Sequence, residues 1–401
     1  MRGNLLRYGI IGTETEIESQ PSFSFVMSQF EVQKLLLDIA ESPRRPEFIG
    51  PALGSSGVSH QDLEDLGLIR REGEQYVLSF TLLTKADAGI VRRVGEQSAR
   101  SLAADVLARR DEIESALGRY DVEGVDAGAA AFILLGCFSL DWDGLALAAE
   151  RGYAATAPED GYIPWAQERA ELSLRAIYWG SHNEYLPDVV VTSFGDHFSR
   201  PRHALPDAIW GLELHLAEAE MPASMAAKLV GPAQQALNRM MGHAGRLTLA
   251  LREGAKTVDE LVETSGLRVE DAGPLMELLV ELDYATQEGE RYQATIPVFT
   301  PADRPLVDEL RGIGECVLEG WMGSGYDELK EELSEITPMR FGVDFAETFT
   351  QIWHYIFGAA NGQLVEAGLF ADPYAEDRRY HGFIPCVWHP DVWRSREAEG
   401  K

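Results

Sequence analysis

The chain has few cysteines and few basic residues for its length. Its three cysteines among 401 residues, Cys137, Cys316 and Cys386, are too few and too scattered for a disulfide framework. Lysine and arginine together number 35 against 65 aspartates and glutamates, which gives a formal net charge of −30. That charge works against non-specific attraction to nucleic acid or to an anionic membrane, although it leaves room for a local basic patch.

Several sequence signals of targeting and catalysis are also missing. Met1 is not followed by a long apolar segment with a small-residue cleavage site, so we expect no secretory signal. The longest apolar stretch, around Gly128 to Leu140, is shorter than the ~20 residues needed to cross a bilayer. P-loop, GxGxxG and HExxH motifs are absent, which leaves nucleotide and zinc-protease chemistry without support. We therefore expect a cytoplasmic protein with no membrane partner, and we assign it no cofactor, metal or catalytic residue.

What is present is the composition of an ordinary globular protein with an internal repeat. The chain is 45% hydrophobic and 25% charged, and its length favours two or three domains. Residues 71–87 align with residues 287–303 without a gap. The matched residues Glu72, Gly73, Glu74, Tyr76, Thr84, Ala86 and Asp87 recur 216 residues later as Glu288, Gly289, Glu290, Tyr292, Thr300, Ala302 and Asp303. We interpret this alignment as two copies of one module.

Each copy has the same predicted plan of three helices and a hairpin. In the second copy we expect helices over Gly245–Gly254, from the capping box Thr257–Glu260 to Ser265, and over Val269–Leu282. Strands over Tyr284–Thr286 and Tyr292–Val298 follow, joined by a turn at Gly289. In the first copy the helices are predicted over Val32–Glu41, Phe48–Leu53 and Ser59–Leu66, before the same hairpin.

Three short helices followed by a two-stranded hairpin are the pattern of a winged helix. The stretches Gln33–Phe80 and Thr257–Val298 resemble the bacterial winged-helix superfamily, which includes ArsR-like regulators. The resemblance is one of pattern, without a diagnostic motif. It implies DNA binding and transcriptional control, but a fold alone does not guarantee either activity.

Long helices are predicted after each hairpin. They cover Ala86–Leu117 and Pro301–Ile336, and the second is expected to be broken at Gly320 and at Gly323–Gly325. A very apolar helix follows each of them, over Ala127–Ala149 and over Asp344–Ala367. Helices of this kind build dimer cores, so we expect either a homodimer or an internal pseudo-dimer.

The predicted fold is mainly α with small β-hairpins: two tandem winged-helix modules, each followed by packed helices, with a hairpin segment inserted between them. The predicted boundaries are 1–22 for an N-terminal segment, 23–155 for the first copy, 156–240 for a unique central segment, 241–371 for the second copy and 372–401 for a tail that packs as far as about Trp393.

The first copy is the better candidate for contact with double-stranded DNA. Its helix-turn-helix is bracketed by paired arginines, and we predict DNA contacts from Arg44, Arg45, Ser59, Gln61, Arg70 and Arg71. The third helix of the second copy carries Arg268 among five nearby carboxylates, which oppose phosphate binding. The alternative is that one or both modules are protein-interaction folds built on degenerate winged helices.

The central segment combines aromatic rings with imidazoles. Strands are predicted over Leu174–Gly180 and Asp188–Phe194, joined by residues 183–187, and a helix over Met221–Met241 leads into the second copy. An aromatic pocket with polar anchors is predicted to bind a small molecule through Trp142, Trp165, Trp179, His182, Asp196, His197, Arg200, Arg202 and Trp210. The same histidines and aspartate could instead bind a metal, act with Ser181 and Ser193 in an enzyme, or simply fix the hairpin.

The function predicted first is thus a winged-helix transcriptional regulator that senses a small molecule through this central pocket. The alternatives are a protein-interaction module and an enzyme that uses the cluster at 182–203.

Overall fold

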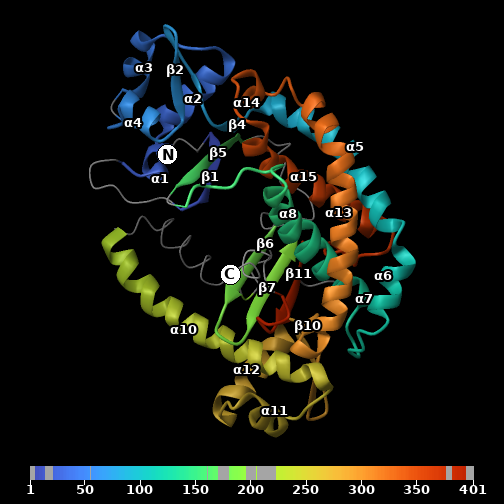
Figure 1. Cartoon of the computed structure of the whole chain (residues 1–401). Helices are drawn as coiled ribbons and strands as arrows, with labels where there is room; N and C mark the ends of the chain where they lie inside the picture. Colours follow the sequence, from blue (N-terminus) through green and yellow to red (C-terminus); the bar gives the residue numbers. More distant parts are fainter. Residues whose placement is uncertain are drawn as a thin grey trace. The chain divides into compact units, whose positions relative to one another are not determined.

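The computed structural model describes residues 5–13, 21–54, 56–159, 161–169, 180–195, 205, 223–375 and 382–393. This part of the chain is mainly α-helical with small β-sheets, as the sequence predicts (Figure 1). It divides into two compact units, each assembled from three stretches of sequence. Unit 1 comprises Met1–Ser98, Leu147–Leu174 and Trp321–Ile356, and unit 2 comprises Ala99–Ala146, Arg175–Gly320 and Phe357–Lys401.

In the first copy, a run of short helices leads into a hairpin, all within unit 1. The elements are α1 (Phe23–Ser28), α2 (Phe30–Glu41), α3 (Pro46–Leu53), α4 (His60–Asp65), β2 (Ile69–Glu72) and β3 (Gln75–Leu78). Ser59 and Asp62 form a capping box that starts α4, because each side chain accepts a hydrogen bond from the backbone N–H of the other. Arg44 and Tyr76 exchange both backbone hydrogen bonds, which joins the segment before α3 to β3.

The second copy repeats this order within unit 2. Its elements are α10 (Ala223–Ala250), the 3₁₀ turn η2 (Leu251–Glu253), α11 (Val258–Ser265), α12 (Val269–Glu281), β8 (Ala285–Glu288) and β9 (Arg291–Ala294). Strands β8 and β9 lie 216 residues after β2 and β3, and Lys256 bridges to Tyr292 as Arg44 does to Tyr76. Asp283 adopts a left-handed φ of 59° where the first copy has Gly67 with φ 69°. Both turns therefore have the same backbone geometry, although only glycine adopts it without strain.

Each unit contains a small sheet, and the sequence did not predict strands β1, β5 and β11 of these sheets. In unit 1, β5 (Tyr162–Glu168) lies between β1 (Leu6–Gly12), which is antiparallel to it, and β4 (Thr81–Leu83), which is parallel. In unit 2, β11 (Phe383–Trp388) is parallel to β10 (Val298–Phe299) and antiparallel to β7 (Val190–Gly195), with β6 (Ser181–Tyr185) at the edge. The N-terminal strand β1 and the central strand β7 thus occupy equivalent places in two equivalent sheets.

The inserted hairpin exists, but its first strand is not where the sequence predicted it. Strand β6 includes residues 183–185, which were assigned to the connecting loop, and Ser181 pairs with Phe194 across the hairpin. Residues 174–179 of the predicted strand lie outside the described residues. Since β7 also pairs with β11, the hairpin is part of the four-stranded sheet of unit 2 rather than an appendage.

Three predictions about the long helices are corrected. The helix predicted over Ala86–Leu117 is two helices, α5 (Lys85–Leu107) and α6 (Arg110–Leu117). In contrast, α13 (Arg304–Glu332) continues through all of its glycines, because the buried Trp321 and Met322 beside them supply packing that exceeds the ~1 kcal/mol cost of a helical glycine. Helix α10 continues to Ala250, so the helices predicted separately over Met221–Met241 and Gly245–Gly254 are one.

The first apolar helix is longer than its most apolar run. Elements α7 (Ala127–Ala131), the π-helix η1 (Phe132–Asp143) and α8 (Gly144–Glu150) form one helix of 24 residues. Among the described residues it is the one helix whose length and composition would allow it to cross a membrane. However, 83% of its apolar window is buried inside the protein, as expected for a core helix.

Each unit joins segments of both copies through polar contacts. In unit 1, the Asp87 carboxylate caps the start of α5 at Thr84 and also accepts the backbone N–H of Thr337, the first residue of α14 (Thr337–Arg340). In unit 2, Arg252 is held by Asp303 and donates to the backbone carbonyl of Asp121. The units are therefore not the two copies, because each unit is closed by a segment from the other copy.

A buried ion pair fixes the π-helix in unit 2. Arg311 of α13 forms two hydrogen bonds to Asp143, with N–O distances of 2.8 and 3.0 Å, and the two side chains are only 11% and 1% exposed. The guanidinium carbon also lies 4.5 Å from the ring centroid of Trp393. Removing one partner would leave an uncompensated buried charge.

We predict that Arg311→Met lowers the free energy of unfolding by about 3–5 kcal/mol, because Asp143 stays buried without its partner. Urea unfolding monitored by tryptophan fluorescence measures the change. Arg304→Met is the matched control on the same helix: Arg304 pairs with Asp308 at 3.6 Å on the surface, and its removal is expected to cost less than about 1 kcal/mol. Equal destabilisation of the two variants would contradict the prediction.

Candidate functional site

Arg44 and Arg45 lie together directly before α3. Arg45 is exposed at the N-cap of α3 and Arg44 is half-buried. Neither guanidinium has a hydrogen-bond or ion-pair partner among the described residues. Beside them is a cavity of about 370 Å³, lined by Leu35, Asp38, Pro43, Arg44, Arg45, Phe48, Ala52 and Gln75. The Phe48 side chain at this site is 59% exposed, so the two arginines and an aromatic ring share one accessible surface.

Ser59 and Gln61 are exposed but already engaged within α4. The Ser59 hydroxyl donates to the Asp62 carboxylate at 2.8 Å and accepts the Asp62 N–H. The Gln61 amide donates to Asp65 at 2.8 Å. Both side chains thus stabilise a helix of six residues, and each would have to exchange a local hydrogen bond to contact a base.

Arg70 and Arg71 have different roles although they are adjacent. Arg70 donates to the backbone carbonyls of Leu78 and Phe341, at 3.1 and 2.8 Å, and pairs with Glu72. Its guanidinium therefore links the hairpin to the turn after α14. Arg71 is exposed, and its Nε donates to the Gly73 carbonyl at the hairpin turn, so most of its guanidinium faces outward.

The corresponding basic side chains of the second copy are paired with carboxylates. Lys256, the counterpart of Arg44 in the bridge to the hairpin, lies 3.0 Å from Glu253. Arg268 lies 3.0 Å from Asp271 at the start of α12, and Arg291 lies 3.2 Å from Glu260. The two copies thus share a fold plan but differ in the charge they present.

The residues predicted to line a central pocket are only partly described. Trp179, Asp196, His197, Arg200, Arg202 and Trp210 lie outside the described residues. Trp165 is on β5 in unit 1, where the Arg7 guanidinium lies 5.5 Å from its ring centroid. His182 is on β6, opposite Ser193 of β7. Trp142 and His182 belong to unit 2 and Trp165 to unit 1, so they do not line one pocket within either unit.

Trp142 lies in a packed aromatic cluster of unit 2. Its ring stacks on Phe138 with centroids 4.8 Å apart, and Trp388 and Trp393 lie 5.3 and 4.7 Å from Phe138. The Trp142 indole N–H donates to the Ser181 hydroxyl at 3.3 Å. These rings pack against one another, so the cluster stabilises the contact of η1 with β11 and β6.

Two kinds of buried group near this cluster have altered acidity. Burial raises the pKa of the Asp141 carboxyl to about 8, so this side chain is mainly neutral at pH 7. Burial also raises the pKa of the Cys137 and Cys386 thiols well above the usual value. These groups are poor nucleophiles and metal ligands in this state, and within the described residues no group of three histidines, cysteines or carboxylates is placed to hold a metal ion.

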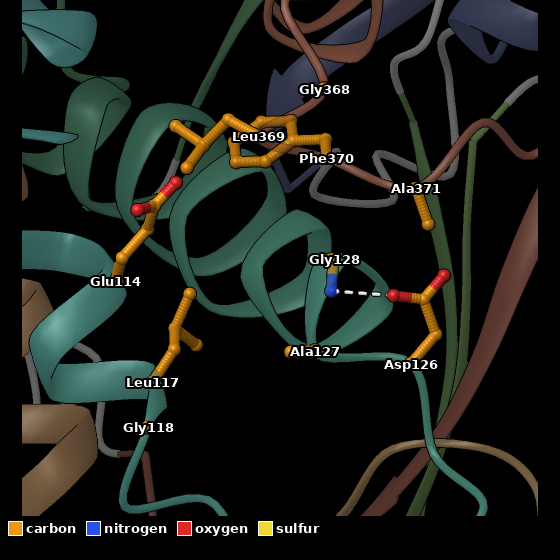
Figure 2. A pocket seen from close by; sticks show the side chains of 10 residues that line it. All are labelled: Glu114, Leu117, Gly118, Asp126, Ala127, Gly128, Gly368, Leu369, Phe370 and Ala371. Atoms are coloured by element: carbon orange, nitrogen blue, oxygen red, sulfur yellow. Dashed lines mark hydrogen bonds between the residues drawn. The ribbon is translucent and has the colours of Figure 1, made fainter.

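A second cavity, which the sequence did not predict, lies in unit 2 at the start of the apolar helix. It has a volume of about 440 Å³ and is lined by Glu114, Leu117, Gly118, Asp126, Ala127, Gly128, Gly368, Leu369, Phe370 and Ala371. Figure 2 shows the carboxylates of Glu114 and Asp126 on opposite sides of it, with Leu117 on the side of Glu114 and with Leu369 and Phe370 along the upper edge. Its lining comes from three segments: the end of α6, the start of α7, and the turn after α15 (Phe345–Glu366).

Comparisons with protein-family models, with curated proteins and with solved structures found no match to this chain. The function must therefore be argued from the residues themselves.

We predict that Asp141→Asn changes how stability depends on pH. Because the folded pKa is raised from 3.8 to about 8, the neutral carboxyl stabilises the fold fully below pH 4, and this contribution disappears as the pH rises towards 8. The decrease is at most about 1.4 kcal/mol per pH unit. Asparagine does not titrate. Urea unfolding between about pH 4 and pH 8 should therefore show that the free energy of unfolding of the variant increases relative to that of the wild type as the pH rises. A constant difference between the two proteins would show that Asp141 is ionised in the folded state.

Proposed function

We propose that the chain is a winged-helix transcriptional regulator that contacts DNA through its first copy. The support is the order of elements in each copy: a helix, a one-residue bridge, two helices and a hairpin to which the bridge is hydrogen-bonded. This order occurs twice, 216 residues apart at the hairpins, which is the arrangement expected of a duplicated winged helix. In such a fold, the third helix faces the major groove and the hairpin contacts the phosphate backbone.

The observation that carries the proposal is the difference in pairing between the basic side chains near the hairpin in the two copies. Arg44 and Arg45 have no ion-pair partner among the described residues, and Arg71 keeps most of its guanidinium accessible. The equivalent face of the second copy pairs each cation with a carboxylate, as Arg268 does with Asp271. Since phosphate binding depends on unpaired cations that displace counterions, the first copy is the one suited to DNA.

Phosphate contacts should dominate this interaction over base contacts. The third helix of the first copy, α4, has six residues, and three of them are the carboxylates Asp62, Glu64 and Asp65. Its neutral donors, Ser59 and Gln61, are hydrogen-bonded to Asp62 and Asp65. The proposed contact is therefore strongly salt-dependent, with sequence preference supplied by few side chains.

The second copy fits a different task, binding to another protein. Its α12 begins with Val269, which is 53% exposed, and continues with Glu270 and Asp271. An acidic helix with an exposed apolar residue repels phosphate but can pack against a basic partner. We propose this as the candidate role of the second copy, alongside DNA contact by the first.

Sensing of a small molecule remains part of the proposal. A regulator needs a ligand that favours one arrangement of the chain over another. The aromatic central segment suggested such a site, and Trp142 and His182 are its described members in unit 2. The alternative is an enzyme that uses residues 182–203, of which the structure describes 182–195.

We predict that replacing both Arg45 and Arg71 with alanine weakens binding to duplex DNA of any sequence. The slope of log K against log salt should decrease by about 0.9 for each phosphate that the variant no longer neutralises, and so by about 2 in total. Fluorescence anisotropy with the DNA upstream of the protein's own coding region, at about 50–200 mM salt, measures both quantities. Arg70 is left unchanged in this variant because it also supports the hairpin.

Arg268→Ala in the second copy is the matched control, and we expect it to leave binding and salt slope unchanged because Asp271 already neutralises Arg268. Equal weakening by both sets of substitutions would show that the two copies act as a symmetric pair. Absence of binding by the wild type at low salt would remove the proposal of direct DNA contact.

A further inference from the structure

The two apolar helices, Ala127–Glu150 and α15, begin with the same local geometry in the two units. In unit 2, Asp126 accepts the Gly128 N–H at 2.8 Å, and the Gly128 carbonyl accepts the Ala371 N–H at 3.0 Å. In unit 1, Asp344 accepts the Ala346 N–H at 3.0 Å, and the Ala346 carbonyl accepts the Ala155 N–H at 2.9 Å. These matched hydrogen bonds identify equivalent positions in the two copies, so the space beside each helix start can be compared directly.

In unit 1 this space is filled by four aromatic rings. Tyr326 lies 4.4, 5.4 and 5.2 Å, centroid to centroid, from Tyr153, Phe345 and Phe349. The Tyr326 hydroxyl also donates to the Tyr153 carbonyl at 2.9 Å. The rings thus pack the turn after α8 against the start of α15.

In unit 2 all four rings are missing. The positions equivalent to Tyr326, Tyr153, Phe345 and Phe349 are occupied by Arg110, Leu369, Ala127 and Ala131. Leu369 and Ala127 line the cavity of about 440 Å³ described above. The cavity of unit 2 therefore occupies the space that aromatic rings fill in unit 1. Its volume lies within the range of small-ligand sites.

The charged groups around this cavity are mostly acidic. Arg110, which replaces Tyr326, is not a lining residue but contacts two of them: its guanidinium pairs with Glu114 at 2.7 Å and donates to the Gly368 carbonyl at 3.4 Å, and it also donates to the Ala367 carbonyl at 3.0 Å. Leu369 and Phe370 form the apolar floor of the cavity, and the carboxylates of Glu114 and Asp126 lie on opposite sides of it (Figure 2). Phe370 and Leu369 are each only 3% exposed, so the floor is apolar and firmly packed.

We propose that this cavity is a binding site for a small organic cation with a flat apolar body, such as an aryl-substituted ammonium. Its ring takes the place of the missing aromatic side chains on the floor, and the carboxylates of Glu114 and Asp126, one on either side of the cavity, attract its ammonium group. The net charge of −30 raises the local concentration of cations and disfavours anionic ligands. This site is independent of the proposed DNA contact.

The test is a calorimetric titration of the full chain with three probes of the same shape. They are 1-naphthylmethylammonium, the neutral 1-naphthylmethanol and the anion 1-naphthoate. We expect the cation to bind, the alcohol to bind about tenfold more weakly, and the anion not to bind. Equal binding of the three probes, or no binding of the cation at millimolar concentration, would overturn the proposal.

Two sets of variants locate the site. Ala127→Phe restores the ring that Phe345 supplies in the other copy and should abolish binding of the cation, whereas Ala104→Phe, at an exposed position of α5, should not. Asp126→Asn keeps the N-terminal cap of α7 and, like Glu114→Gln, should reduce binding of the cation about tenfold while leaving the alcohol unchanged. Circular dichroism checks that each variant is folded. If Ala127→Phe and both carboxylate variants bind the cation as well as the wild type does, the ligand binds elsewhere and the assignment is wrong.

Discussion

Each of the long helices α5 and α13 begins near a buried aspartate that serves two segments of chain at once. The Asp87 carboxylate accepts hydrogen bonds from Thr84 at the start of α5 and from the backbone of Thr337, which belongs to the other copy. Asp303 caps its own helix at Thr300 and holds Arg252, whose guanidinium reaches the carbonyl of Asp121. Because a carboxylate has several acceptor positions, one side chain can cap a helix and still bind a second donor. The position of each hairpin relative to the segments of its own unit depends on these two carboxylates.

The duplication preserves this framework while the chemistry of the copies differs. The hairpins, the bridges to Tyr76 and Tyr292, and the small sheets are common to both. Arg44 and Arg45 of the first copy have no ion-pair partner among the described residues, whereas Lys256, Arg268 and Arg291 of the second copy are each paired with a carboxylate. Backbone hydrogen bonds and capping aspartates need the same residue types in both copies, whereas surface charges do not affect the fold and can change separately.

The two copies also differ in the packing of side chains beside the starts of the two apolar helices. Unit 1 is closed by rings around Tyr326, and unit 2 has an open cavity beside Ala127. The two units therefore differ at this point in what their side chains fill, although the helix starts keep the same hydrogen bonds. The capping of Gly128 by Asp126 keeps the helix start in place without the rings.

The features that the sequence determined by itself are local ones. The capping box at Thr257 and the hairpin turns at Gly73 and Gly289 follow from residue types a few positions apart, and the structure has them at the expected residues. The predicted DNA-contacting arginines all lie on the first copy, but only the structure separated Arg70, which supports the hairpin, from Arg71, which is accessible.

Long-range pairing was decided by the tertiary structure alone. Strands β1, β5 and β11 are short and pair with segments distant in sequence, as Leu6 does with Glu168, so no local period reveals them. The glycines of α13 looked like helix breaks because their cost is local, whereas the packing that outweighs it comes from elsewhere in the chain. The cavity of unit 2 was invisible for the same reason: Glu114, Ala127 and Leu369 become neighbours only when three distant segments meet, and no local pattern in any one segment records that contact.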